Sequence, residues 1–258
     1  MKLASIQLEI DDRETKQERM NRVDAILSGL SGYDLILLPE IWATGYFSFD
    51  HYIDEAEPMD GFFVRHYAQK AKELHANLFA GSFIESKGEH FFNTSVLLDR
   101  NGKLTGSYRK IHLFRYGSAE GDLLSGGTRS VVVPTDFGKV GLSTCYDLRF
   151  PELYRKELDR GATIFLVTSA WPLRRLDHWK LLNQARALEN QCYLLSCNSS
   201  GRTQGVLLGG HSRVVDPWGT VLASAGEAAT VLTAEIDLAK VAAVRAEFPQ
   251  LRHRVHFD

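Results

Sequence analysis

The chain has 258 residues, of which 44% are hydrophobic and 24% are charged, and its formal net charge is −2. These values are typical of a globular protein, and the lack of a basic block argues against a nucleic-acid partner. Every apolar run falls short of the roughly 18 residues that a membrane helix needs, so no membrane association is expected.

The cysteines and the N-terminus bear on the cellular compartment. Cys145, Cys192 and Cys197 are few and scattered, which does not suit a disulfide framework. The opening residues, MKLASIQLEI, do not have the pattern of an export signal. The sequence therefore predicts a protein of the reducing cytoplasm.

The first half of the chain predicts alternating strands and helices. Residues 1–10 alternate, which places Ala4, Ile6, Leu8 and Ile10 on one face of a strand. Further strands are expected over residues 33–40, 77–83, 91–99 and 104–110, and helices over residues 14–30 and 60–76. Asn101 and Gly102 between two of these strands predict a hairpin with a type I′ turn.

The second half continues the alternation. Strands are expected over residues 130–134, 138–145, 163–171, 191–198 and 229–236, helices over 151–161 and 176–190, and a hairpin over 211–223. No Pro/Ser-rich linker interrupts the pattern. The sequence therefore predicts one α/β domain, whose buried strands need helices on the outside.

Three polar residues of different chemistry follow predicted strands: Glu40, Lys110 and Cys145. In open α/β sheets, ligands bind at the carboxyl ends of strands, so these side chains are candidates for one site. Each also has an ordinary interpretation, because a cysteine is often a small buried apolar residue and single Glu or Lys residues are usually solvated.

Together the three residue types supply what cleavage of an amide by a thiol requires. A free cysteine has a pKa of about 8.5, so the thiol needs a base such as Glu40. The oxyanion that forms when sulfur attacks a carbonyl needs fixed positive partners. Lys110 and the backbone N–H of Tyr146 are the candidates, and the charge of Lys110 would also favour the thiolate.

The motifs LLPEIWATGY, YRKIHLF and STCYDLRFPE, in this order, resemble the nitrilase superfamily of carbon–nitrogen hydrolases. CYDLRFPE is most similar to the ω-amidase branch, which cleaves monoamides of small dicarboxylates such as α-ketoglutaramate. The resemblance implies Glu40 as general base, Lys110 as oxyanion stabiliser and Cys145 as nucleophile. It also implies a second glutamate after the lysine; Glu120 is expected there, with Asp122 as the alternative.

The same resemblance implies an α-β-β-α sandwich that covers residues 1–258 as one domain. It further implies no metal or cofactor, a small-molecule amide as substrate, and a homodimer.

Substrate selectivity must come from the walls of the site. Arg149 follows Cys145 by four residues and suits a substrate carboxylate, although an internal ion pair with Asp147 or Glu152 is an equal alternative. An apolar throat could be formed by five residues, of which Tyr46 and Trp171 are preferred because they follow strand ends: Tyr46, Phe47, Tyr146, Trp171 and Pro172.

Other functions remain open at this point. An N-carbamoyl amino-acid hydrolase or a nitrilase would use the same three residues. A Cys–His hydrolase would use His112, but its position two residues after Lys110 favours a structural role. A catalytically silent binding protein on the same fold is the alternative outside enzymes. Cys192 and Cys197 lie in a predicted apolar strand without a metal-binding pattern.

Overall fold

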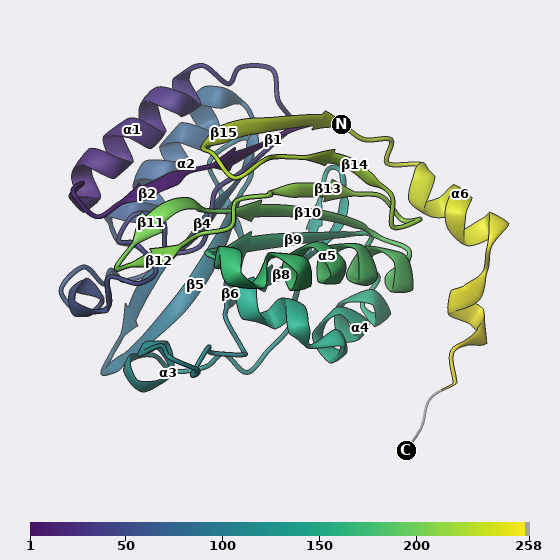
Figure 1. Ribbon diagram of the computed structural model, residues 1–258. Coiled ribbons are helices and arrows are strands. Elements are labelled where there is room, and N and C mark those ends of the chain that lie inside the picture. Colours follow the sequence, from purple (N-terminus) through teal and green to yellow (C-terminus); the bar gives the residue numbers. More distant parts are fainter. Residues whose placement is uncertain (256–258) are drawn as a thin grey trace.

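Two six-stranded sheets pack face to face at the centre of the molecule, and helices cover their outer faces (Figure 1). This arrangement is seen in a computed structural model that describes residues 1–255. The predicted α-β-β-α sandwich is therefore confirmed as a single domain; the last three residues of the predicted range, 256–258, lie outside the described residues.

Both sheets have a parallel centre with antiparallel flanks. In order across the first sheet, the strands are β15 (Thr230–Glu235), β1 (Lys2–Gln7), β3 (Leu35–Leu37), β4 (Asn77–Lys87), β5 (His90–Leu98) and β6 (Leu104–Arg109). In order across the second sheet, they are β14 (Val221–Ser224), β13 (Arg213–Val215), β10 (Tyr193–Asn198), β9 (Ile164–Ser169), β8 (Gly138–Thr144) and β7 (Val131–Thr135).

The helices form the outer layers. The first sheet carries α1 (Lys16–Ser28) and α2 (Phe62–Leu74), and the second carries α4 (Pro151–Asp159) and α5 (Leu176–Asn190) (Figure 1). Two further helices are α3 (Glu120–Leu123), which is short, and α6 (Lys240–Glu247). The described residues also form the 3₁₀ turns η1 (Phe49–His51), η2 (Cys145–Arg149), η3 (Leu173–Arg175) and η4 (Gln250–His253). A small third sheet consists of β2 (Glu9–Asp11), β11 (Ser200–Thr203) and β12 (Val206–Leu207).

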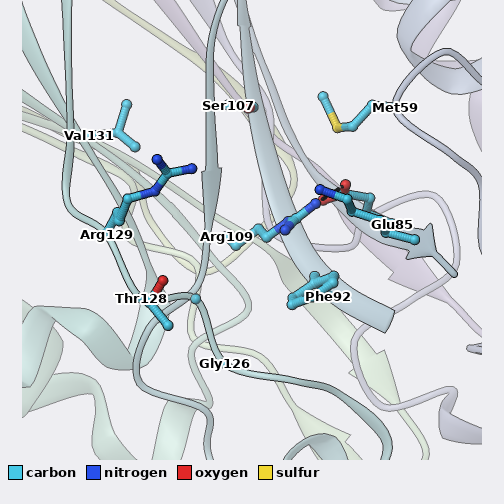
Figure 2. Close-up of a pocket in the computed structure, with 11 residues that line it drawn as sticks. Met59, Glu85, Phe92, Ser107, Arg109, Gly126, Thr128, Arg129 and Val131 are labelled. Atoms are coloured by element: carbon cyan, nitrogen blue, oxygen red, sulfur yellow. Dashed lines mark hydrogen bonds and ion pairs between the residues drawn. The ribbon is translucent and has the colours of Figure 1, made fainter. Parts of the chain in front are cut away.

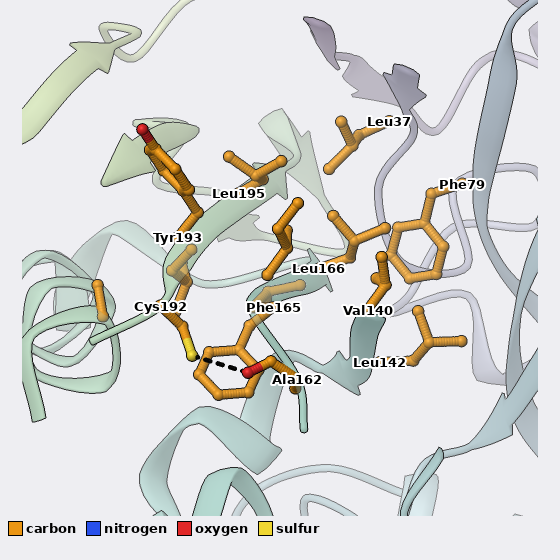
Figure 3. Packing of buried hydrophobic residues seen from close by; sticks show 14 of the residues in the cluster. Leu37, Phe79, Val140, Leu142, Ala162, Phe165, Leu166, Cys192, Tyr193 and Leu195 are labelled. Atoms are coloured by element: carbon orange, nitrogen blue, oxygen red, sulfur yellow. Dashed lines mark hydrogen bonds between the residues drawn. The ribbon is translucent and has the colours of Figure 1, made fainter. Parts of the chain in front are cut away.

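The central strands are apolar on both faces because both faces are buried. In β3, Leu35 and Leu37 point into the core between the sheets, whereas Ile36 packs toward α1 and α2. Figure 3 shows Leu37 and Phe79 of the first sheet beside Leu166 of the second. Burying one such side chain contributes about 1.5–3 kcal/mol, so this core fixes the separation of the sheets.

Most predicted elements are confirmed, and two details were wrong. The strand expected over residues 33–40 ends at Leu37, because the chain turns away from the sheet before Glu40. The hairpin after β5 forms, but only Gly102 of its turn has a positive φ, so the turn is not type I′. Instead the Asp99 carboxylate accepts hydrogen bonds from the N–H groups of Asn101 and Lys103, both at 2.9 Å.

None of the helices within residues 1–255 combines the length and the apolar character needed to cross a bilayer.

Candidate active site

Glu40 is positioned by a strained turn at the end of β3. Ile41, the next residue, has φ +41°, which is unusual for a β-branched side chain. Its N–H donates to the Ser82 hydroxyl at 3.0 Å, which holds the turn against β4. The Glu40 side chain is completely buried, and its carboxylate accepts a hydrogen bond from the N–H of Ala170, at the end of β9, at 3.0 Å. The two sheets therefore meet at this carboxylate.

Lys110 directly follows β6, and its side chain is completely buried. Its Nζ lies 2.8 Å from Oε1 of Glu40 and 2.8 and 2.9 Å from the two oxygens of Glu120. The Asn93 amide donates to both carboxylates, at 2.8 Å to Glu40 and 2.9 Å to Glu120. One ammonium thus links two carboxylates inside the protein.

Cys145 lies at the junction of β8 and η2, with φ +48°. A non-glycine residue in this left-handed region indicates a local conformation that the surrounding structure imposes. Asp147 anchors the turn: it accepts hydrogen bonds from the N–H of Thr144 at 3.0 Å and from the Tyr108 hydroxyl at 2.7 Å. The turn places the thiol close enough to Glu40 and Lys110 for their charges to act on it.

Burial dominates the electrostatics of these groups. Burial, followed by the charge of Glu40, raises the pKa of the Cys145 thiol, and the opposing effect of Lys110 is smaller. Burial also raises the pKa of Glu40. For Lys110, burial opposes the charge, but Glu120 and Glu40 keep its pKa well above its usual value. Lys110 acts on the thiol in the expected direction, but burial and the charge of Glu40 outweigh it.

Glu120 occupies the place of the second acidic group. It is fully buried at the start of α3, whereas Asp122 on the same helix is exposed. Besides Lys110, the Glu120 carboxylate accepts hydrogen bonds from the Tyr46 hydroxyl at 3.0 Å and the Phe114 N–H at 2.7 Å. These contacts fix Glu120 beside the ammonium, so the alternative of Asp122 finds no support.

A cleft opens onto the thiol, and its free space of about 320 Å³ includes open solvent at its mouth. All five residues expected in the apolar throat line this cleft: Tyr46, Phe47, Tyr146, Trp171 and Pro172. Phe114, Ala170, Arg149 and Arg175 line it as well. The sequence did not indicate Phe114 or Arg175, because loops bring them to the cleft, and it did not indicate Ala170, because this residue at the end of β9 carries no polar group.

Arg149 is free of the internal ion pairs considered from the sequence. Asp147 is occupied by the turn around Cys145, and within residues 1–255 no salt bridge joins Arg149 to Asp147 or Glu152. The guanidinium carbon lies 4.7 Å from the centre of the Trp171 ring, and Nη2 is 3.2 Å from Nδ1 of His178. The Arg149 side chain is therefore free to bind an anion in the cleft.

Comparison with known proteins places this site in a family. Residues 2–246 match the family model described as carbon-nitrogen hydrolase. The chain belongs to the carbon-nitrogen hydrolase family. It is 38% identical to the 2-oxoglutaramate amidase of Paenarthrobacter nicotinovorans, over 98% of this chain and 88% of that protein. It is 33% identical to the mouse omega-amidase NIT2, over 98% and 94% of the two chains.

A solved structure agrees with the fold of this carbon-nitrogen hydrolase. The CN-hydrolase superfamily protein XC1258 of Xanthomonas campestris, described with an arsenic adduct in its active site, superposes with a TM-score of 0.92 at 30% identity. The similarity covers 100% of this chain and 98% of that chain. The assignment to hydrolases of carbon–nitrogen bonds therefore rests on sequence and on fold.

His112 and the two other cysteines of the hydrolase have structural contacts. The His112 ring stacks on Phe150 at 3.7 Å, and its Nδ1 lies 2.7 Å from Oδ1 of Asp147. Cys192 and Cys197 are buried with their thiols on backbone carbonyls, and burial raises the pKa of each to about 12. Within residues 1–255, no cluster of three or more His, Cys, Asp or Glu side chains is arranged to hold a metal ion.

A second cavity of the hydrolase lies beside β6 and contains no thiol (Figure 2). Its wall includes the ion pair of Arg109 with Glu85, in which Nε donates to Oε2 at 2.8 Å. The Thr94 hydroxyl donates to the same oxygen at 2.6 Å, and Thr94 pairs with Arg109 across the two strands. This contact fixes the end of β6 one residue before Lys110, so we interpret it as structural support for the site.

Proposed function

We propose that this hydrolase is an ω-amidase-like enzyme that uses Cys145 as nucleophile and Glu40 as general base. One observation carries the proposal: the Cys145 thiol lines a cleft that also holds unpaired arginines, and the charges of the buried Glu40–Lys110 ion pair act on that thiol. A thiol with a raised pKa needs a base at the moment of attack, and Glu40, whose charge acts on this thiol, is the candidate base.

In the proposed reaction, Sγ of Cys145 bonds to the amide carbon while the thiol proton passes to Glu40. The carbonyl oxygen becomes an oxyanion, stabilised by the charge of Lys110 and by the Tyr146 N–H. Collapse of this intermediate breaks the C–N bond, and Glu40 returns the proton so that ammonia leaves. Glu40 then takes a proton from water, whose oxygen bonds to the thioester carbon. The C–S bond breaks and Glu40 returns the proton to sulfur, which leaves the free thiol and a carboxylic acid.

Glu120 has a supporting role in this proposal. It contacts Lys110 rather than the thiol, and Tyr46 and the Phe114 N–H hold it in place. Its negative charge keeps Lys110 protonated in a fully buried position. Glu120 therefore preserves the charge that the oxyanion requires.

The proposed substrate is a small amide that carries a carboxylate, such as α-ketoglutaramate. The names of the relatives in Paenarthrobacter nicotinovorans and mouse support this class. The cleft supports it independently, because Trp171 and Tyr146 form apolar walls and Arg149 offers a carboxylate partner. An N-carbamoyl amino acid or a nitrile remains the alternative substrate.

A substrate panel with detection of released ammonia tests this proposal. We expect turnover of α-ketoglutaramate and glutaramate, and little turnover of N-carbamoyl amino acids or nitriles. Glu40→Gln should abolish turnover, while His112→Ala should retain it if the protein stays folded. The opposite pair of results would identify a Cys–His hydrolase. No ammonia from any compound, and no labelling of Cys145 by a small electrophile, would identify a silent binding protein.

We further propose a cytoplasmic homodimer. All three cysteines are free thiols, which suits a reducing compartment. Leu181 and Leu188 on α5 are large exposed apolar side chains, as is Trp218, whose neighbour Gly219 lies against Leu188; such side chains are a feature of association surfaces. Light scattering on the purified protein tests the dimer: the mass of one chain, 29.0 kDa, would refute it.

A further inference from the structure

Two guanidinium groups face the cleft, and neither has an acidic partner. Arg149 and Arg175 both line the space above Cys145, and no Asp or Glu does. Across residues 1–255, the structure shows no salt bridge to either arginine. We call these two residues the arginine pair. Two like charges with no counter-ion in one cleft are a feature of sites that receive an anion.

Aromatic contacts hold the arginine pair in place. The Arg175 guanidinium lies 5.0 Å from the centre of the Phe114 ring, as Arg149 lies over Trp171. The Trp171 indole N–H donates to the backbone carbonyl of Arg175 at 2.7 Å, so Trp171 contacts both arginines. An arginine over an aromatic ring keeps its N–H edge free for a carboxylate.

The local electrostatics also favour an anion. Partial burial, then the charges of Arg174 and Arg149, lower the pKa of Arg175. The free protein therefore holds Arg175 in a position that disfavours its charge. A bound carboxylate between Arg149 and Arg175 would offset that repulsion.

We infer that Arg175 is a second specificity-determining residue, which acts with Arg149 to bind the carboxylate at the end of the substrate remote from the amide. This inference rests on the proposed function and adds to it. The hydrolase would then select monoamides of dicarboxylic acids through two guanidinium groups, and neutral amides would lack both contacts.

The test compares two amides of similar length, glutaramate and the uncharged pentanamide. Arg175→Met keeps an apolar side chain beside Phe114 but removes the charge. We expect kcat/KM for glutaramate to fall about tenfold to a hundredfold, as for the loss of a charge-assisted hydrogen bond. The value for pentanamide should stay unchanged, and Arg175→Lys should recover part of the loss.

Arg174→Met is the matched control, because Arg174 is the exposed neighbour and does not line the cleft. It should leave kcat/KM for both amides as in the wild type. Equal losses for glutaramate and pentanamide in Arg175→Met would overturn the inference and make Arg175 part of the wall only. An unchanged value for glutaramate would overturn it as well.

Binding of the product separates this inference from the proposed function. Glutarate binding to Cys145→Ala, measured by calorimetry, should weaken about tenfold or more when Arg175→Met is added. Unaltered affinity would overturn the role of Arg175. A wild-type protein that releases no ammonia from any amide would refute the proposed function, but this binding difference would remain measurable.

Discussion

Removal of Lys110 would show whether its charge serves the reaction or only the fold. Nζ bonds to Glu40 at 2.8 Å and to Glu120 at 2.8 Å, and all three side chains are 0% exposed. In Lys110→Met, two carboxylates would share an enclosed space without a counter-ion. Breaking a buried ion pair in this way costs about 3–5 kcal/mol of folding free energy.

The cost of protonating one of the two carboxyl groups gives an independent value for the same loss of folding free energy. Either carboxyl group can take up a proton, and the ordinary pKa of Glu40 is 4.5. At pH 7 that proton costs about 3.4 kcal/mol, since each pH unit corresponds to about 1.36 kcal/mol. The two values agree, so we expect Lys110→Met to lose about 3–4 kcal/mol at pH 7 and less at pH 5. Denaturant unfolding at both pH values measures this loss.

The double variant Lys110→Met/Glu120→Gln separates the two roles. It removes one carboxylate together with the ammonium, so most of the lost stability should return. Its kcat should nevertheless stay about 10²–10³ below wild type, as after loss of an oxyanion donor. Recovery of kcat together with stability would refute the catalytic role, because Lys110 would then only balance charge. A loss of stability that is equal at pH 5 and pH 7 would refute the ionic argument.

Three further predictions concern the nucleophile, a buried acid and a close packing contact. Cys145→Ala should abolish ammonia release while thermal unfolding stays near that of wild type; retained turnover would exclude Cys145 as nucleophile. Glu157 is 0% exposed, and burial followed by Asp147 raises its pKa well above the ordinary 4.5. Its contribution to stability is therefore complete below pH 4.5 and is lost as the pH rises toward the folded-state pKa, so the stability of Glu157→Gln relative to wild type should rise between pH 5 and pH 7, measured by denaturant unfolding. A constant difference across that range would contradict a neutral buried Glu157. At Gly81, with φ +72°, an added Cβ would lie 2.0 Å from the Pro39 carbonyl oxygen, so Gly81→Ala should lower kcat by displacing Glu40 and cost about 1–3 kcal/mol in stability; normal kinetics would show that the turn adapts.

The sequence predicted the layers and the meeting of the three central residues. Continuous apolar runs such as Leu35 to Leu38 indicated strands that are buried on both faces, and the structure places them between a helix layer and a second sheet. Glu40, Lys110 and Cys145 each follow a strand, and the rule that sites form at the carboxyl ends of strands was enough to predict that they lie together. The roles of these residues remain predictions for the assays above.

Asn93 was missed although the sequence contained a usable signal. It is a polar residue in the apolar strand β5, and the hairpin register places it beside Lys110, whose N–H donates to the Asn93 carbonyl at 2.9 Å. Counting pairs back from the turn at Gly102 finds Asn93 only if the bulge in this hairpin is included in the count. The bulge between Leu97 and Leu98 shifts that count, and no sequence pattern indicated the bulge.

Arg175 could not be found in the same way. It belongs to the loop between β9 and α5, and its backbone carbonyl is held by the indole of Trp171. The conformation of such a loop depends on tertiary contacts, and the periodic patterns of apolar residues that predict strands and helices do not encode these contacts. For the same reason the sequence left Arg149 divided between an internal ion pair and the substrate.

The unequal placement of charge along the cleft has a consequence for turnover. Two carboxylates against one ammonium make the floor negative, whereas Arg149 and Arg175 make the entrance positive. A monoamide fits this polarity in one orientation only, with the neutral end inward. Hydrolysis converts that inner end into an anion that faces Glu40, so the product is repelled from the place where it forms. We therefore expect fast release and weak inhibition by accumulated dicarboxylate.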